Sequence, residues 1–305
     1  MPIWEILHRY DFSMLPPLSQ VPKVLNPPAD VFTRYFVPQA APIVITDSPV
    51  FSSGPRTLED VVRRDAGKLQ VNVRGGDYAD VNKRQKERMA LSEYVEMYVR
   101  PAERKEQPDD SGDLPRYAGN TPLSREEFET LGFRYPECFE GKEFIEPRLW
   151  FGPRGSLTPL HYDETANLVC QYIGKKHFPL FPPSQIPYLY PRGSGPTWSN
   201  VADPRRPDLE KYPLFAQARP VEVTLNAGEM LFLPAFWAHF VVNLDTSLMV
   251  NFWPRYGSPQ KYKSSFMGQV ARVKRRASRD FLRLSSKLYA NAAAMAARTE
   301  TRRVS

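Results

Sequence analysis

The chain has 305 residues, of which 42% are hydrophobic and 12% aromatic, so a substantial core can form and global disorder is excluded. Its 41 Lys and Arg residues outnumber its 34 acidic residues, and this surplus has meaning only where it is concentrated. The two cysteines lack CxxC spacing, which argues against a disulfide framework and a zinc ribbon. They fit a reducing compartment, so we expect a cytoplasmic protein, or a nuclear one if the source is eukaryotic.

The amino terminus carries acids and lacks a long apolar core, which argues against a signal peptide. No uninterrupted apolar run approaches the roughly 18 residues that a membrane helix needs. We therefore expect no membrane association.

The first 116 residues alternate between short strands and helices. We expect strands over 41–46 and 69–74, helices over 57–64 and 92–99, a proline-punctuated lead-in over 1–30, and a surface loop over 101–116.

From about residue 144 the pattern changes to one short strand after another, separated by Gly and Pro turns. The expected strands cover 168–173, 176–181, 221–225, 229–233, 239–243 and 248–253. This spacing predicts a β-sandwich or barrel. We find no internal repeat.

The carboxyl-terminal residues 260–298 carry one apolar stripe at helical spacing. The helix could pack on its own domain or form a homodimer contact, and the sequence leaves both open. Residues 272–303 contain ten Lys or Arg and two acids. Ten minus two gives this segment a net charge of +8, which exceeds the net charge of +7 of the whole chain. This basic segment is either a solvated face or a surface for RNA or an acidic partner.

One of the four histidines stands two residues before an aspartate, in His161-Tyr162-Asp163. On extended backbone both side chains project from one face and could share a metal ion. The third ligand could come from His239, which starts a predicted strand, because His8 lies in the lead-in and His177 neighbours Lys176 with the opposite orientation. Two imidazoles and one carboxylate form the facial triad of non-haem Fe(II) oxygenases. Satisfied polar residues are the alternative reading.

Lys176 follows Gly174 and precedes an apolar run, where it could point inward with Phe178 and Leu180. A buried ammonium needs an anionic partner, and a substrate carboxylate is the natural candidate if the protein supplies none. An edge lysine that points to solvent is the alternative.

Several motifs occur together in this chain. They are Thr158-x-x-His161-x-Asp163, Asn167, Gly174-Lys-Lys176, Asn226-Ala-Gly-Glu-Met-Leu-Phe-Leu-Pro234, Trp237-x-His239 and Val250-Asn-Phe-Trp253. The combination resembles the JmjC-type, cupin-like oxygenases. It is similar to their small hydroxylase branch, which includes the asparaginyl hydroxylase of hypoxia-inducible factor, short lysyl hydroxylases and the tRNA wybutosine hydroxylase.

The resemblance implies a mainly β fold with flanking helices, a double-stranded β-helix or jelly roll followed by a helical carboxyl-terminal segment. It divides the chain into strands and helices that complete the barrel (1–116), the JmjC core (117–257) and the basic helical segment (258–305).

The same resemblance implies residue roles. His161, Asp163 and His239 would hold Fe(II), and Lys176 and Thr158 would bind the distal carboxylate of 2-oxoglutarate. Three more residues, Asn167, Asn251 and Trp253, match positions that line the cosubstrate pocket, and Tyr117 matches a tyrosine that contacts the cosubstrate. Gly119 stands where the asparaginyl hydroxylase has a substrate-contacting glutamine, so the target of that enzyme does not transfer.

The implied reaction consumes O2 and 2-oxoglutarate, yields succinate and CO2, and hydroxylates a substrate. Demethylation would follow if the attacked carbon is bonded to nitrogen. We expect a protein or peptide substrate, with RNA bound through 272–303, a small molecule, or a non-enzymatic binding protein of cupin fold as alternatives.

A long insert over 184–220 separates two predicted strands, and such inserts are often functional lids or packed loops. Its aromatic residues Tyr188, Tyr190 and Trp198 could be core plugs or substrate platforms, and we expect packing.

Overall fold

The computed structural model describes residues 20–65, 67–75, 85–104, 114–139, 143–163, 165–191 and 198–255. The predicted carboxyl-terminal helix, its homodimer contact, the basic residues 272–303 and His8 lie outside this part of the chain.

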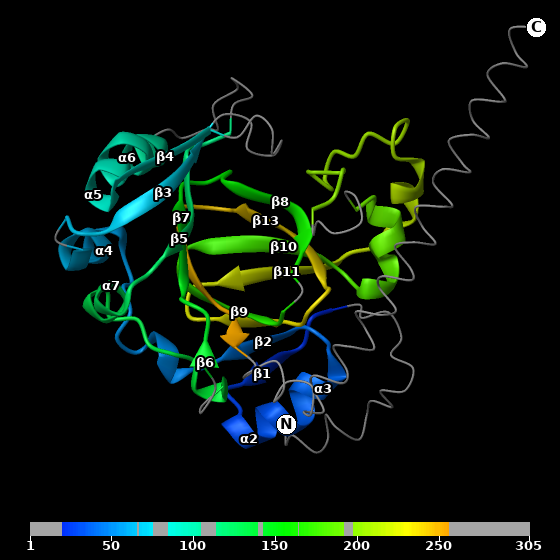
Figure 1. Cartoon of the computed structure of the whole chain (residues 1–305), viewed down its shortest axis with the longest axis horizontal. Helices are drawn as coiled ribbons and strands as arrows, with labels where there is room; N and C mark the ends of the chain where they lie inside the picture. The colour runs from blue at the N-terminus through cyan, green and yellow to red at the C-terminus, as the bar shows by residue number, and fades with distance from the viewer. Residues whose placement is uncertain are drawn as a thin grey trace, which may run out of the picture.

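Two β-sheets that face each other form the body of the protein (Figure 1). In spatial order the larger sheet contains β1 (Lys23–Leu25), β2 (Ile43–Thr46), β12 (Met230–Leu233), β9 (Asn167–Ile173), β14 (Ser247–Phe252), β7 (Arg148–Gly152), β5 (Tyr117–Pro122), β3 (Gln70–Gly75) and β4 (Gln85–Ala90). The smaller sheet contains β11 (Val221–Asn226), β10 (Lys175–Phe181), β13 (Ala238–Asn243) and β8 (Leu157–Tyr162). A separate pair joins β15 (Pro254–Arg255) and β6 (Glu143–Phe144).

The chain winds between the two sheets from β7 to β14. Strands β7, β9, β12 and β14 lie in the larger sheet, and β8, β10, β11 and β13 lie in the smaller one. All pairings among these strands are antiparallel. This is the double-stranded β-helix, and it confirms the predicted fold. The strands β1 to β5 extend the larger sheet at both edges.

Helices cover the outer face of the larger sheet and one of its edges. They are α2 (Ala29–Val31), α3 (Val37–Gln39), α4 (Leu58–Asp65), α5 (Leu91–Tyr94), α6 (Arg100–Arg104) and α7 (Arg125–Thr130). Wider π-turns over Phe32–Phe36 and Val95–Val99 join α2 to α3 and α5 to α6, and short 3-10 turns lie at Pro49–Phe51, Glu137–Phe139, Pro183–Leu189 and Pro213–Gln217. In Figure 1, α4, α5 and α6 lie beside β3 and β4.

Two expectations for this region were wrong. The lead-in contains β1, which pairs in parallel with β2, because backbone hydrogen bonds to a neighbouring strand do not depend on a long apolar run. The expected loop over 101–116 begins inside a helix, since α6 continues to Arg104. Pro101 is the second residue of α6 and lies just after the wider π-turn over Val95–Val99.

The larger sheet is buried on both faces, so its central strands are apolar without alternation. Along β9, Leu168 and Cys170 pack with the helices, whereas Val169 packs between the two sheets. This follows the period of two of a strand. The result is one core cluster under the helices and a second one inside the β-helix, where the site lies.

The strands expected from residue 168 onward are all present, with ends shifted by at most one residue. Cys138 and Cys170 are free thiols and both are buried. Within the part of the chain that the structure describes, none of the helices combines the length and the apolar composition of a membrane span.

Candidate active site

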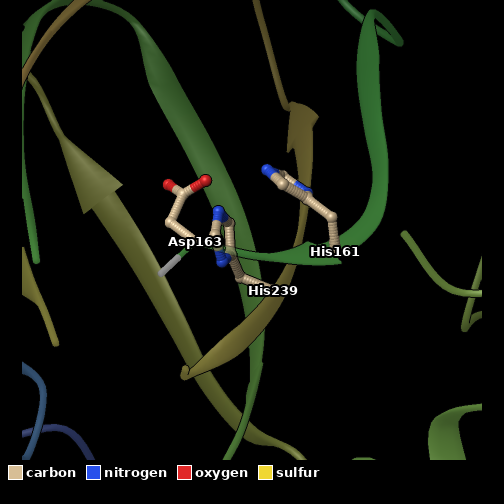
Figure 2. A group of neighbouring side chains, drawn as sticks. All are labelled: His161, Asp163 and His239. Carbon is tan, nitrogen blue, oxygen red and sulfur yellow. The ribbon is translucent and has the colours of Figure 1, made fainter. Parts of the chain in front are cut away.

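Three predicted ligands converge inside the β-helix. His161 lies near the end of β8, Asp163 follows that strand, and His239 faces His161 across the antiparallel pairing of β8 with β13. Their potential ligand atoms all lie within 4.8 Å of one another. Figure 2 shows the three side chains pointing toward a common space. The register of the two strands shifts between His239 and Val241, and such a bulge changes the direction of side chains beside it.

Backbone carbonyl groups orient both imidazole rings. His161 Nδ1 lies 2.8 Å from the carbonyl oxygen of Pro159, and His239 Nδ1 lies 3.0 Å from that of Trp237. A carbonyl accepts, so each Nδ1 carries the proton. The Nε2 atoms are therefore left with free lone pairs, which is the form that a metal ligand requires.

The protein environment keeps both rings neutral. Burial, and then the neighbouring His239, lower the pKa of His161 to about 3. Burial also lowers the pKa of His239, although Asp163 acts in the opposite direction. Metal binding needs deprotonated ligands, so this environment favours it near neutral pH.

Two predicted pocket residues orient the carboxylate of Asp163. The indole N–H of Trp253 donates to Asp163 Oδ2 at 3.3 Å, and the amide of Asn167 reaches the same oxygen at 3.5 Å. Hydrogen bonds of this kind hold a ligand in one position and tune its basicity.

Lys176 points inward from β10, as predicted, and its side chain is 0% exposed. Its ammonium donates to the hydroxyl of Tyr117 at 2.9 Å and to Asn243 Oδ1 at 2.6 Å. Both acceptors are neutral. Burial lowers the pKa of Lys176 to about 7, with Asp245 acting in the opposite direction. The neighbouring His177 points the other way and pairs with Glu222, as expected from the strand period.

The three ligands line a cavity of about 160 Å³. Thr158, Asn167, Asn251 and Trp253 line it, so the structure gathers these predicted residues around the triad. The buried Thr158 Oγ1, Asn167 Oδ1 and Asn251 Oδ1 have no hydrogen-bond partner within the protein. Unsatisfied buried polar atoms are rare in native proteins, and several around one cavity indicate that a polar ligand completes them.

The insert contributes one residue that the sequence analysis placed wrongly. Tyr188 and Tyr190 pack against the core, as expected. Trp198 instead lines the cavity and stacks on His161, with ring centroids 4.8 Å apart. An isolated bridge between Trp198 and His161 brings the insert onto β8, a contact that no local sequence pattern shows.

Among the lining residues that were not predicted, three carry polar groups, namely Arg74, Asn120 and Trp150. Arg74 belongs to a predicted strand, in which its side chain projects from the face opposite to that of Val73. This alternation was the available signal. It could not be used without knowing that this face of β3 turns toward the cavity.

The residues present fit both groups that the resemblance implies. The donor set of two neutral imidazoles and one oriented carboxylate suits Fe(II). The buried ammonium and the Thr158 hydroxyl, which can donate a hydrogen bond, suit a small dianion such as 2-oxoglutarate.

Comparisons with known proteins agree with this geometry. Residues 28–257 match the family model of the cupin-like domain. The chain is 30% identical to human tRNA wybutosine-synthesizing protein 5 over 76% of this chain and 77% of that protein. It is 30% identical to zebrafish lysine-specific demethylase 8 over 79% of this chain, which spans 59% of the relative. JmjC domain-containing protein D of Dictyostelium discoideum is 40% identical over 35% of this chain and only 24% of its own length.

Proposed function

Because this chain belongs to the cupin-like family of JmjC-domain proteins, we propose that it is an Fe(II)- and 2-oxoglutarate-dependent dioxygenase that hydroxylates a side chain of a protein or peptide. Family members are typically 2-oxoglutarate-dependent oxygenases. The observation that carries the proposal is a three-residue ligand group that lines one cavity, together with an inward-pointing, buried ammonium whose hydrogen-bond partners are neutral.

His161, Asp163 and His239 would hold the iron and leave coordination positions for other ligands. Lys176 and the Thr158 hydroxyl would bind the distal carboxylate of 2-oxoglutarate, and Tyr117 would orient the ammonium. Asn167 and Asn251 would complete the polar rim of the pocket. With O2, the bound iron and keto acid supply the oxidising power that yields succinate, CO2 and a hydroxylated substrate.

The apolar part of the cavity has its own task. Val169, Phe178 and Met249 line the space beside the ligands, and their apolar surfaces would disfavour water there. Trp198 restricts the position of His161 from the insert side. Exclusion of water protects a reactive centre from side reactions.

The Asp163→Ala variant tests the proposal. Removing the carboxylate leaves two imidazoles, so we expect iron affinity and 2-oxoglutarate-dependent succinate formation to fall together to background. The matched control is His177→Ala, which removes an imidazole outside the cavity and should leave both unchanged. Succinate is measured with and without iron and oxygen. An Asp163→Ala protein that still turns over at the wild-type rate would contradict the proposal, as would a folded wild type that binds no iron.

The protein or peptide substrate has one direct support, the similarity over most of this chain to a relative named as a lysine-specific demethylase. A tRNA substrate is the second candidate, because another relative with similar coverage is named for tRNA wybutosine synthesis and residues 272–303 are strongly basic. A gel-shift assay with tRNA across a salt series separates them. Phosphate contacts release counterions, so genuine RNA binding weakens steeply as salt rises. Absence of salt-sensitive binding removes the RNA candidate.

A further inference from the structure

A cationic side chain other than Lys176 lines the cavity and has no task in the proposed chemistry. Arg74 lies on β3 and is only 8% exposed. Its guanidinium carbon lies 4.6 Å from the centroid of the Trp150 ring on β7. A guanidinium over the face of a tryptophan is held by a cation–π interaction. The position of this charge is therefore determined by the packing of two strands.

The backbone makes room for this pair. The pairing of β5 with β7 is interrupted between Ala118 and Thr121, and Asn120 in this bulge has a φ of 55°. A Cβ on Gly119 would approach the Trp150 ring to 3.0 Å and the guanidinium carbon of Arg74 to 3.3 Å. Glycine at this position thus permits the close stacking of Arg74 on Trp150.

The polar groups of this pair share one property. The Trp150 indole N–H is buried without a hydrogen-bond partner in the protein. A guanidinium and an indole N–H are donors only, and neither can accept a hydrogen bond. With five N–H donors, an arginine can serve a ligand in addition to any protein contact. A ligand that satisfies both groups must present acceptor oxygens.

The charges in the cavity also favour a ligand with acceptor oxygens. Of the described residues that line it, Asp163 is the one acid, and it is a proposed iron ligand. The two charges of Fe(II) together with Lys176 would offset Asp163 and the dianionic 2-oxoglutarate. Arg74 adds a guanidinium, which stays protonated, to the lining of the same cavity. An anionic group on the substrate would be complementary to it.

On the basis of the proposed function, we infer that Arg74 and Trp150 form a subsite for a carboxylate on the substrate, that is, for an Asp or Glu side chain of a peptide. A carboxylate has two coplanar oxygens that match the fork of a guanidinium, and such charge-assisted pairs are stronger than neutral hydrogen bonds. The subsite would select acidic substrates and place them against the iron ligands.

The test measures peptide binding without turnover. Blocked pentapeptides with Asp, Glu, Asn, Gln or Lys at the centre are added to the anaerobic protein with Fe(II) and 2-oxoglutarate, and the absorption of the iron–keto acid complex is followed. We expect the acidic peptides to bind about 10- to 100-fold more tightly than their amide counterparts. The Arg74→Gln variant should lose this preference, and Arg74→Lys should retain part of it.

Two further variants sharpen the assignment. Trp150→Phe keeps an aromatic ring and removes the N–H, so the affinity for the Glu peptide should fall by about 3- to 10-fold. The control Arg88→Gln removes an exposed arginine from the adjacent strand β4 and should bind like the wild type. The affinity for 2-oxoglutarate should stay within about twofold in all four variants, which also shows that they are folded.

Equal binding of acidic and amide peptides by the wild type would overturn the inference, as would an acidic preference that survives in Arg74→Gln. Loss of 2-oxoglutarate affinity in Arg74→Gln would place Arg74 in the cosubstrate site, and tighter binding of a short RNA than of every peptide would point to a phosphate. Failure of the proposed function is separate, because the wild type would then form no iron–keto acid absorption. Peptide preference can still be followed in that case by tryptophan fluorescence.

Discussion

At the scale of single residues, Lys176 differs from an exposed lysine in its pKa. Burial lowers its pKa from 10.5 to about 7. Between these values the unfolded chain binds more protons than the folded one, so the free energy of unfolding of the ligand-free protein rises with pH across this range. The cost of the buried charge is fully present below about pH 7. A dianion in the pocket would stabilise the ammonium and remove most of this cost.

The lowered pKa of Lys176 predicts a pH dependence of cosubstrate binding. If 2-oxoglutarate requires the ammonium, its affinity falls by up to about tenfold per pH unit above pH 7. Titration with Mn(II) in place of iron, followed by calorimetry between pH 6.5 and 9, measures it. The Lys176→Met variant should show a weak and nearly flat profile. A steep wild-type profile that persists in Lys176→Met would assign the proton to another group.

The same variant separates binding from stability. Lys176→Met keeps the apolar stem and removes a buried charge, so its melting temperature without ligand should equal or exceed that of the wild type. Its 2-oxoglutarate affinity should fall by at least about tenfold. The control is Lys175→Met, because Lys175 is exposed beside it on the same strand. A stable Lys176→Met protein with normal affinity would show that the anion site lies elsewhere.

At the scale of elements, the tight turn between β9 and β10 leads directly into the strand that carries Lys176. Gly174 in this turn has a φ of 68°, and a Cβ there would overlap with the carbonyl oxygen of Thr246. Gly228, between β11 and β12, has a φ of 84° but no atom within 4 Å of a Cβ. Both positions would strain the backbone of any residue with a Cβ, and they differ in available space.

Alanine at each position therefore separates the two effects. Gly228→Ala should lower the free energy of unfolding by about 1 kcal/mol from backbone strain alone. Gly174→Ala should lower it by a further 1 to 3 kcal/mol or so, because the loop between β13 and β14, which carries Thr246, must move. Urea unfolding of both variants gives the difference. Equal losses would mean that the turn relaxes without displacing Thr246.

At the scale of the whole molecule, the site joins both sheets. β8, β10 and β13 of the smaller sheet carry His161, Lys176 and His239, whereas Asn167 and Asn251 project from β9 and β14 of the larger one. A metal and a dianion bound between the sheets would link them. Ligands that bind only the folded state raise its stability.

We therefore expect Fe(II) or Mn(II) with saturating 2-oxoglutarate to raise the melting temperature by about 5 to 10 °C, and a chelator to reverse the rise. Asp163→Ala should show no rise with metal. Thermal unfolding followed by circular dichroism under anaerobic conditions measures it. An equal rise in Asp163→Ala would place the metal at another site.

The local sequence determined much of this protein. Short apolar runs bounded by Gly and Pro turns were sufficient for the strands from residue 168 onward, and the period of two of a strand then gives the face of each side chain. The His161-x-Asp163 spacing and the inward phase of Lys176 followed from the same period.

Only the tertiary structure decided which residues lie across the cavity from His161 and Asp163. Arg74, Trp150 and Trp198 come from strands or loops distant in sequence, and they reach the triad through sheet pairing and an isolated bridge. The stacking of Arg74 on Trp150 also depends on a bulge at Gly119 and Asn120, which depends on β5 pairing with β7. Periodicity gives the face of a strand, but the neighbour that this face meets is set by long-range pairing, which no short window of sequence contains.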